Sequence, residues 1–397
     1  MGYIFHTNVQ IGDSLFNLSK SVSMYGNRYI LKYLRNYFEE DFGPRLCALY
    51  GLKKTGKSTM MLQMLQYLDL TKTAFIKLSI KDTMSDLIAD VRELKGRGIQ
   101  NILIDDITLV EDFISHAAML SDIYCAMGIK IVITGDDSLE IEIARCDELY
   151  DRCVLLHTNY ISYKEFCSVF GIYDKDEYIE YGGTMENEIM DCSNPDYDKD
   201  YLAFYSYKST KEYIKTAICK NLQNSLKKQN YGVHWYVIKE IKEEDLEDAI
   251  ISVIEKVSCE LLNEVIEEKL NSSKDQINWK KIQEEINTIV CEMIHYCNQY
   301  STIVENKIIY DLCALHTLAK VQVKNQKNLY EEKYIFLQPG MQFAIIKETI
   351  ERLKGCEYLK SLSFDEQNYI QEELIAIVKK EMFNRIDLYE KSFDKKR

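Results

Sequence analysis

The residues with the clearest chemical purpose lie in a glycine-containing loop near residue 50. Gly51, Gly56, Lys57 and Ser58 have the spacing G-x-x-x-x-G-K-[ST]. Glycines let successive backbone N–H groups turn toward one anion, and a helix that starts just after the loop adds partial positive charge. A lysine at this position reaches the β- and γ-phosphates, and the hydroxyl after it suits Mg²⁺. The spacing therefore predicts a loop that binds nucleotide phosphates.

The sequence around the loop has the order that this motif requires. Residues 45–50 (RLCALY) are an apolar run typical of a buried parallel strand, and residues 58–68 carry helical spacing without Pro or Gly. The alternative is an ordinary glycine turn between a strand and a helix. We expect the following residues to contact the nucleotide: Gly51, Lys53, Lys54, Thr55, Gly56, Lys57, Ser58 and Thr59.

Two carboxylates follow another apolar run, NILIDD, at residues 101–106. The carboxyl ends of neighbouring parallel strands meet at one edge of a sheet, so Asp105 can hold Mg²⁺ together with Ser58. Asp106 is then placed to polarise the attacking water as a catalytic residue. Two acids at a strand end can instead be plain turn residues.

The next apolar run, IVITGDDS, also ends in polar side chains. Thr134 or Asp136 can sense the γ-phosphate of a bound nucleotide. Arg145 and Arg152 follow, and either can act as a catalytic finger that stabilises phosphoryl charge, in its own subunit or in a neighbouring one. The alternative for both arginines is a surface salt bridge.

Composition narrows the class of protein. The formal net charge is −14, from 49 basic and 63 acidic residues, which disfavours an extended nonspecific DNA-binding surface but allows a local basic patch. There is no bilayer-length apolar run and no secretory signal pattern, so we expect a cytoplasmic protein without membrane contact. The twelve cysteines form no C-x-x-C pair. A metal site at Cys291, His295 and Cys297 is a weaker alternative to burial as apolar residues.

Strand and helix patterns alternate after a weakly patterned start. Strands are expected at 45–50, 73–80, 101–107, 130–137 and 153–158, with helices at 27–43, 58–68, 83–98 and 110–128. This alternation predicts a parallel sheet covered by helices on both faces.

The pattern becomes mainly helical after about residue 165. Long helices are expected at 243–270 and 279–300, and residues 306–345 have the order helix, strand, turn, strand, helix, as in a winged helix. Lysines around its wing (Lys320, Lys324, Lys327 and Lys333) can contact nucleic-acid phosphates, although protein contacts are the alternative. The expected divisions are 1–26 (N-terminal segment), 27–165 (core), 166–240 (lid-like helices), 241–300 (helical insertion), 301–350 (winged helix) and 351–397 (helical tail).

Several of these segments together resemble a large family of prokaryotic AAA-type ATPases. YGLKKTGKST, ILIDDI, IVITGDDS, DRCVLLHTNYISYKEF and YGGTMENE occur in the family's order and near its spacing. Asp151-Arg152 is similar to the family's GR element, ISYKEF to LSFKEF, and Gly182-Gly183 to its GG element. The resemblance covers residues 25–240 and, more weakly, 300–345. It implies an α/β P-loop core of AAA type, ATP and Mg²⁺ as ligands, and a C-terminal winged helix.

Three departures from the family pattern affect the expected activity. Asp106 stands where the family usually has Glu, so slow hydrolysis is expected, and Asp136-Asp137 replaces small hydroxyl residues. The restriction-type nuclease domain that often ends the family's chains is not expected in this sequence. One hypothesis is therefore an Mg²⁺-dependent ATPase that moves its winged-helix module, and the other is an ATP-gated switch or scaffold with little turnover. A homo-oligomer, a protein partner, nucleic acid and the choice between ATP and GTP stay open.

Overall fold

The computed structural model describes residues 3–158, 160–186, 202–227, 243–272, 277–294, 302–324 and 329–394. The chain folds into two compact units. Unit 1 consists of Met1–Asn159, Lys164–Ile172 and Lys220–Tyr236, and unit 2 of Tyr160–Tyr163, Tyr173–Cys219 and Val237–Arg397. The divisions expected from the sequence at residues 26, 165, 240, 300 and 350 stay predictions. No helix in the described part of the chain is long and apolar enough to cross a membrane.

Unit 1 is built on a six-stranded sheet with the order β1-β3-β4-β5-β2-β6. The strands are β1 (Asn8–Ile11), β2 (Leu46–Tyr50), β3 (Thr73–Lys77), β4 (Asn101–Asp105), β5 (Lys130–Gly135) and β6 (Cys153–His157). The five expected strands are present and parallel to one another. Their carboxyl ends therefore meet at one edge of the sheet, where the predicted phosphate and metal ligands follow β2, β4 and β5.

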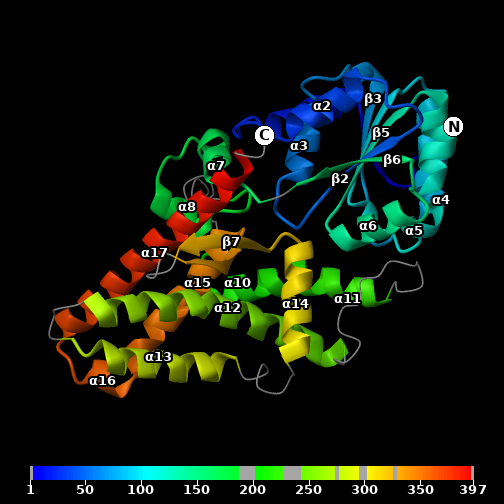
Figure 1. Cartoon of the computed structure of the whole chain (residues 1–397). Coiled ribbons are helices and arrows are strands. Elements are labelled where there is room, and N and C mark those ends of the chain that lie inside the picture. The colour runs from blue at the N-terminus through cyan, green and yellow to red at the C-terminus, as the bar shows by residue number, and fades with distance from the viewer. Residues whose placement is uncertain are drawn as a thin grey trace. The chain divides into compact units, whose positions relative to one another are not determined.

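Both faces of this sheet are covered by apolar helices, as expected for a parallel sheet. The helical segments of unit 1 are α1 (Asp13–Ser21), α2 (Leu31–Glu39), α3 (Lys57–Met64), η1 (Leu70–Lys72), α4 (Met84–Gly96), η2 (Ile107–Leu109), α5 (Phe113–His116), η3 (Leu120–Tyr124), η4 (Cys125–Met127), α6 (Ser138–Cys146), α7 (Tyr163–Phe170, from Lys164 on) and α11 (Lys220–Lys227). Figure 1 shows α2 and α3 on one side of the sheet and α4 on the other.

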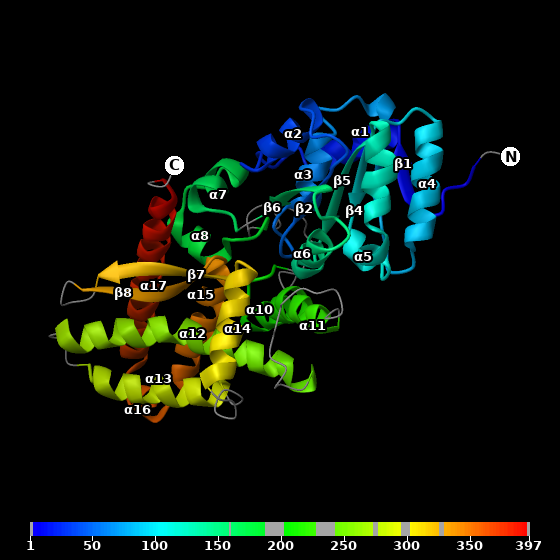
Figure 2. The same ribbon diagram turned by 45° about the vertical axis from the view of Figure 1, so that its right-hand side comes forward.

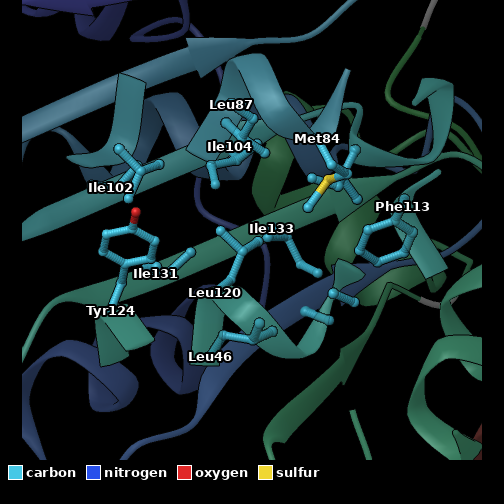
Figure 3. Packing of buried hydrophobic residues seen from close by; sticks show 14 of the residues in the cluster. Leu46, Met84, Leu87, Ile102, Ile104, Phe113, Leu120, Tyr124, Ile131 and Ile133 are labelled. Atoms are coloured by element: carbon cyan, nitrogen blue, oxygen red, sulfur yellow. The ribbon is translucent and has the colours of Figure 1, made fainter. Parts of the chain in front are cut away.

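Side-chain alternation along each strand separates the core into two clusters. Ile102, Ile104, Ile131 and Ile133 point to the face of α4, where they pack with Met84, Leu87, Phe113 and Leu120 (Figure 3). Leu103 and Val132, from the intervening positions, pack with residues of α1, α2 and α3 on the other face. The period of two along β4 and β5 thus fixes which helices each strand residue supports.

The first strand was not expected from the sequence. β1 pairs with β3 in the antiparallel direction and so adds an antiparallel edge strand to the expected parallel sheet. The buried Asp90 carboxylate of α4 holds the preceding chain by accepting hydrogen bonds from Tyr3 Oη (2.9 Å), Thr7 N (2.8 Å) and Thr7 Oγ1 (2.8 Å). The contacts made by one helix residue, rather than a long apolar pattern, therefore anchor the chain at β1.

The helix expected over residues 110–128 is also different in the structure. It is replaced by the short segments α5, η3 and η4, of which η3 has π-helical hydrogen bonds. Its buried residues still face the sheet, among them Phe113 and Leu120. The apolar spacing is therefore met by a series of turns instead of one continuous helix.

Unit 2 is mainly helical. Its elements are α8 (Lys175–Tyr181), α10 (Tyr207–Tyr213), η6 (Ile214–Cys219), α12 (Glu243–Ser272), α13 (Trp279–Met293), α14 (Thr302–Ala314), β7 (Leu318–Lys324), β8 (Tyr330–Phe336), α15 (Pro339–Arg352), η9 (Leu353–Gly355), α16 (Glu357–Lys360) and α17 (Phe364–Asp394). Figure 2 shows α12 and α13 running side by side, in agreement with the expected helical pair. Helix α15 supplies much of the core, with Ile345, Ile346 and Ile350 fully buried.

The order helix, strand, strand, helix expected for residues 306–345 is observed as α14, β7, β8 and α15. β7 and β8 pair in the antiparallel direction. Leu318 lies opposite Phe336 at one end of the pairing, and Lys324 lies opposite Tyr330 at the other end. Gly183 and Gly340 both lie in tight contacts of this unit; a Cβ on Gly183 would come within 2.5 Å of the Gln338 backbone. The identification of this region as a winged helix stays a prediction.

Candidate nucleotide-binding site

The loop between β2 and α3 has the backbone shape that the glycine spacing requires. Gly51 has φ +149°, and a Cβ there would lie 2.2 Å from Thr158 Oγ1, so no side chain fits. Gly56 adopts the left-handed conformation with φ +88° and directly precedes α3. Lys57 and Ser58 thereby become the first two residues of a helix whose N–H groups face the loop.

Lys57 is almost completely buried, with 4% of its side chain exposed. Its Nζ donates to the carbonyl oxygens of Gly51 at 2.8 Å and Leu52 at 2.7 Å. It also pairs with Asp136 Oδ1 at 2.9 Å, just after β5. A carboxylate of the protein therefore neutralises the lysine that is expected to bind phosphate.

Ser58 and Asp105, the two predicted metal ligands, are in direct contact. Ser58 Oγ donates to Asp105 Oδ1 at 3.0 Å, and Thr134 Oγ1 donates to the same carboxylate oxygen at 2.5 Å. Asp105 and Thr134 are buried. The strand ends of β4 and β5 and the start of α3 are thus joined through one carboxylate, as the sequence predicted for their positions.

The second oxygen of Asp105 is occupied by Lys77, a residue that sequence reasoning missed. Lys77 is the last residue of β3 and lies opposite Asp105 in the strand register. Its Nζ is 2.7 Å from Asp105 Oδ2 and 2.6 Å from Asp106 Oδ2. Burial lowers the pKa of Lys77, but its attraction to the two carboxylates outweighs this effect and raises the pKa overall. The lysine is therefore a charged ammonium ion that contacts both carboxylates.

Asp106 is held in a conformation that is uncommon for residues other than glycine. Its φ is +63° and ψ +40°, and its backbone N–H donates to Thr134 Oγ1 at 3.2 Å. Burial, followed by the neighbouring Asp105 charge, raises the pKa of Asp106, while Lys77 opposes the shift. A carboxylate with a raised pKa at a strand end has the character of a general base.

A buried ion pair fastens the loop to α7. The Arg28 guanidinium makes two 2.9 Å contacts with the Glu165 carboxylate, which also accepts from Tyr29 N at 2.7 Å. The same guanidinium donates to the Thr55 carbonyl of the loop. Glu165 belongs to the YKEF segment, so this segment has a direct structural connection to the phosphate-binding loop.

The two predicted finger arginines lie at different ends of the sheet. Arg145 pairs with Glu142 at 3.0 Å, and the other oxygen of Glu142 accepts from Tyr50, the residue before the loop. Arg152 pairs with Asp122 at 2.7 Å, and its carbonyl accepts from Leu46 N at the amino end of β2. Because the loop follows the carboxyl end of β2, Arg152 begins at the opposite end of this strand from the loop, and its finger role stays a prediction.

The turn that carries Asp136 is bound by α11. Asn221 Nδ2 donates to the Asp136 carbonyl at 3.1 Å, and Asn221 Oδ1 accepts from Ser138 N at 2.7 Å. Asn224 Nδ2 donates to Asp137 Oδ2 at 2.7 Å. Asp136, which pairs with Lys57, is therefore connected to α11 through its own turn.

The other predicted loop residues lie in or beside this site. Thr55 Oγ1 bonds to the Leu52 carbonyl at 2.8 Å and to Thr158 Oγ1 at 2.7 Å, and it is buried. Lys54 has φ +62°, and Thr59 is in the first turn of α3. Lys53 lies in the same loop. Their contacts with a nucleotide stay predictions.

The weaker alternatives have little support within the described residues. No group of three or more metal-ligating side chains occurs there, and His295 and Cys297 of the alternative metal site lie outside them. Lys320 pairs with Glu332 at 3.0 Å and Lys333 with Glu264 at 3.1 Å. Lys327 is also outside the described residues.

One of three comparisons with known proteins, the match to a family model, agrees with a nucleotide-binding site. Residues 43–167 match a family described as "AAA domain". No curated protein matches the sequence. Two solved structures are similar at low identity: the Aeropyrum pernix ORC1 protein in complex with DNA and AMPPCP-bound DnaA from Aquifex aeolicus. The first is 11% identical over 82% of this chain and 94% of that chain with a TM-score of 0.28; the second is 12% identical over 95% and 96% with a TM-score of 0.24. Both TM-scores are below 0.5, so neither structure defines the fold or function of this chain.

Proposed function

From the premise that residues 43–167 are a P-loop domain of AAA type, we propose that this chain binds ATP with Mg²⁺ and hydrolyses it slowly. The observation that carries the proposal is the contact between Ser58 Oγ and Asp105 Oδ1 at 3.0 Å. These residues come from separate elements, and each belongs to a different sequence motif. Their meeting beside the buried Lys57 is the arrangement that binding of a nucleotide with its metal requires.

The donor set fits magnesium. A serine hydroxyl and a carboxylate are hard oxygen ligands, and magnesium sites in nucleotide-binding proteins commonly use one or two such groups plus phosphate oxygens. Ser58 and Asp105 would hold the ion, and when bound it would neutralise charge on the phosphate oxygens. Lys57 would bind the β- and γ-phosphates after exchanging its Asp136 partner for them.

Asp106 is the residue proposed to act on water. It is a base one methylene shorter than Glu and is held by Lys77 at 2.6 Å. Because proton transfer depends on sub-ångström placement of the base, a shortened and occupied carboxylate should give slow turnover. The same observation supports the second candidate function, an ATP-gated switch with little hydrolysis.

Binding or release of the nucleotide would affect the helical part of the chain through Asp136. When Lys57 binds phosphate, Asp136 loses its 2.9 Å partner, and its turn is bonded to Asn221 and Asn224 of α11. A change in this turn would therefore displace α11, which continues the helical segments α10 and η6 along the chain. We propose that this connection moves the predicted winged-helix module or exposes a binding surface for a protein partner.

The first test compares ATP binding and hydrolysis by the wild type, Lys57→Ala and Asp106→Asn in the presence of Mg²⁺. Loss of the Lys57 ammonium should weaken binding on the order of 100-fold, because it removes charge-assisted bonds to phosphate. Asp106→Asn should keep binding and lose turnover. Lys72→Ala, on a lysine about half exposed in η1, is a matched control expected to keep both.

The outcomes separate the two candidate functions. Turnover by the wild type that Asp106→Asn abolishes supports the hydrolase. Tight ATP binding without turnover, in the wild type and in Asp106→Asn alike, supports the switch. Equal ATP affinity in the wild type and Lys57→Ala would contradict the proposed binding site altogether.

A further inference from the structure

We propose that Lys77 is a built-in cation that occupies the metal-binding carboxylates while no nucleotide is bound and leaves them when Mg²⁺ and nucleotide enter together. This inference rests on the proposed function and adds to it a residue that controls metal binding. Lys77 would be a positioning residue, since it acts on Asp105 and Asp106 rather than on the substrate.

The contacts show that Lys77 satisfies both carboxylates at once. Its Nζ lies 2.7 Å from Asp105 Oδ2 and 2.6 Å from Asp106 Oδ2. Asp105 Oδ1 already accepts from Ser58 and Thr134. Both oxygens of the proposed metal ligand are therefore bonded, and a metal ion must displace at least one of these donors to bind.

Of these donors, Lys77 is the one best able to leave. The Lys77 side chain is 43% exposed and therefore has access to water. By comparison, the side chain of Lys57, which pairs with Asp136 instead, is 4% exposed. Lys77 ends β3 and its flexible methylene chain can extend into water without breaking a strand hydrogen bond. Thr134 is fully buried and also accepts from Asp106 N, so its displacement would disrupt the strand ends.

The negative charge gathered at the ends of β4 and β5 explains why a displaceable cation is useful there. Asp105, Asp106 and Asp136 gather at the ends of β4 and β5, and their carboxylates are balanced by Lys57 and Lys77. Without Lys77, the two adjacent carboxylates would lose the cation that bridges them and would attract a free divalent ion. With Lys77 present, the ion gains less on binding alone, so metal and nucleotide are expected to bind as one unit.

The test measures Mn²⁺ binding to the nucleotide-free protein by electron paramagnetic resonance. Mn²⁺ prefers the same oxygen ligands as Mg²⁺ and is directly visible. Lys77→Met should bind Mn²⁺ about tenfold or more tightly than the wild type, since the competing ion pair is gone. Adding Asp105→Asn to Lys77→Met should abolish this gain. Lys81→Met, on an exposed lysine four residues later, should behave as the wild type.

A second measurement uses the wild type alone and so does not depend on the folding of a variant. Acetylation of Lys77 by acetic anhydride, followed by mass spectrometry, should be slow without ligand and several-fold faster with Mg²⁺ and a non-hydrolysable ATP analogue. Acetylation of Lys81 should not change.

Equal Mn²⁺ affinity in Lys77→Met and the wild type would overturn the proposal, as would Lys77 acetylation that does not respond to a nucleotide that binds. If no nucleotide binds, the proposed function fails, but the Mn²⁺ comparison still decides the role of Lys77 because it is made without nucleotide.

Discussion

Unit 1 and unit 2 both bury ionisable side chains, and the charged groups of the site in unit 1 differ from one buried carboxyl group of unit 2. In unit 1 the buried charges of the site each have an oppositely charged partner: Lys57 pairs with Asp136, Asp105 with Lys77, and Arg28 with Glu165. In unit 2, Asp311 of α14 is 3% exposed, its Oδ2 has no hydrogen-bond partner among the residues that the structure describes, and burial raises its pKa to about 7. A strongly shifted carboxyl group alone therefore does not locate the site; opposite charges converging from several strand ends do.

The largest effect should come from breaking a matched pair of unit 1. Glu165→Ala leaves the Arg28 guanidinium buried without its bidentate partner. Arg28 is then no longer held in place to donate to the Thr55 carbonyl. We expect a loss of about 3–5 kcal/mol in the free energy of unfolding, measured by urea denaturation. ATP affinity should fall as well, because the loop loses its connection to α7.

The double variant Arg28→Met with Glu165→Leu provides the matched control. Replacing both charges by apolar groups of similar size should recover most of the lost stability. A single Glu165→Ala variant as stable as the wild type would show that this pair is not a structural link of the loop.

Removing the unmatched charge of unit 2 should have the opposite sign. The folded-state pKa of Asp311, about 7, lies above its ordinary value of 3.8. Between these values the folded chain keeps a proton that the unfolded chain has released, so stability falls as pH rises through this window and stays reduced above it. Asp311→Asn should therefore be more stable than the wild type at pH 8 by about 2–4 kcal/mol, with little difference at pH 4.

The measurement is urea denaturation at pH 4, 5, 6.5 and 8, followed by the fluorescence of tryptophan, of which Trp279 is buried in unit 2. Asp365→Asn, at an exposed position in the first turn of α17, is the control for a general loss of negative charge. A wild-type stability that does not fall between pH 5 and 8 relative to Asp311→Asn would contradict the comparison of the two units.

The smallest effects are expected at the exposed pairs of unit 1. Arg145 and Arg152 each bond one acid on the surface, where water and salt screen the interaction. Replacing either with Ala should leave the thermal unfolding midpoint and ATP affinity unchanged. Turnover measured over a range of protein concentrations would then test the finger roles. A loss of turnover with Arg152→Ala, at concentrations where chains associate, would assign it to a neighbouring subunit's site.

The sequence predicted the site where the chemistry depends on local spacing or on strand ends. The loop from Gly51 to Ser58 is one continuous motif, and Asp105 and Asp136 each follow a recognisable apolar strand. Because parallel strands end at a common edge, these three segments had to converge. Lys77 could have been found by the same argument, since it lies five residues into its strand as Asp105 does.

Other parts could not be predicted because their partners are far apart in the sequence. Arg28 and Glu165 are separated by 137 residues, and neither the helix pattern before the first expected strand nor YKEF specifies the other. β1 has only four residues, NVQI, so its polar–apolar alternation is too short to be distinguished from a loop. The segment 110–128 kept its apolar spacing but broke into turns, which periodicity alone does not distinguish from a helix.

The short strand β1 also has a consequence for the solubility of the protein. It covers β3, whose residues Ala74, Phe75 and Ile76 are buried and whose backbone groups would otherwise form an open sheet edge. Open apolar edges recruit strands from other molecules. Shortening the chain before Gly12, or placing a tag that pulls Tyr3 and Thr7 away from Asp90, would therefore remove the guard of this edge and favour self-association through β3.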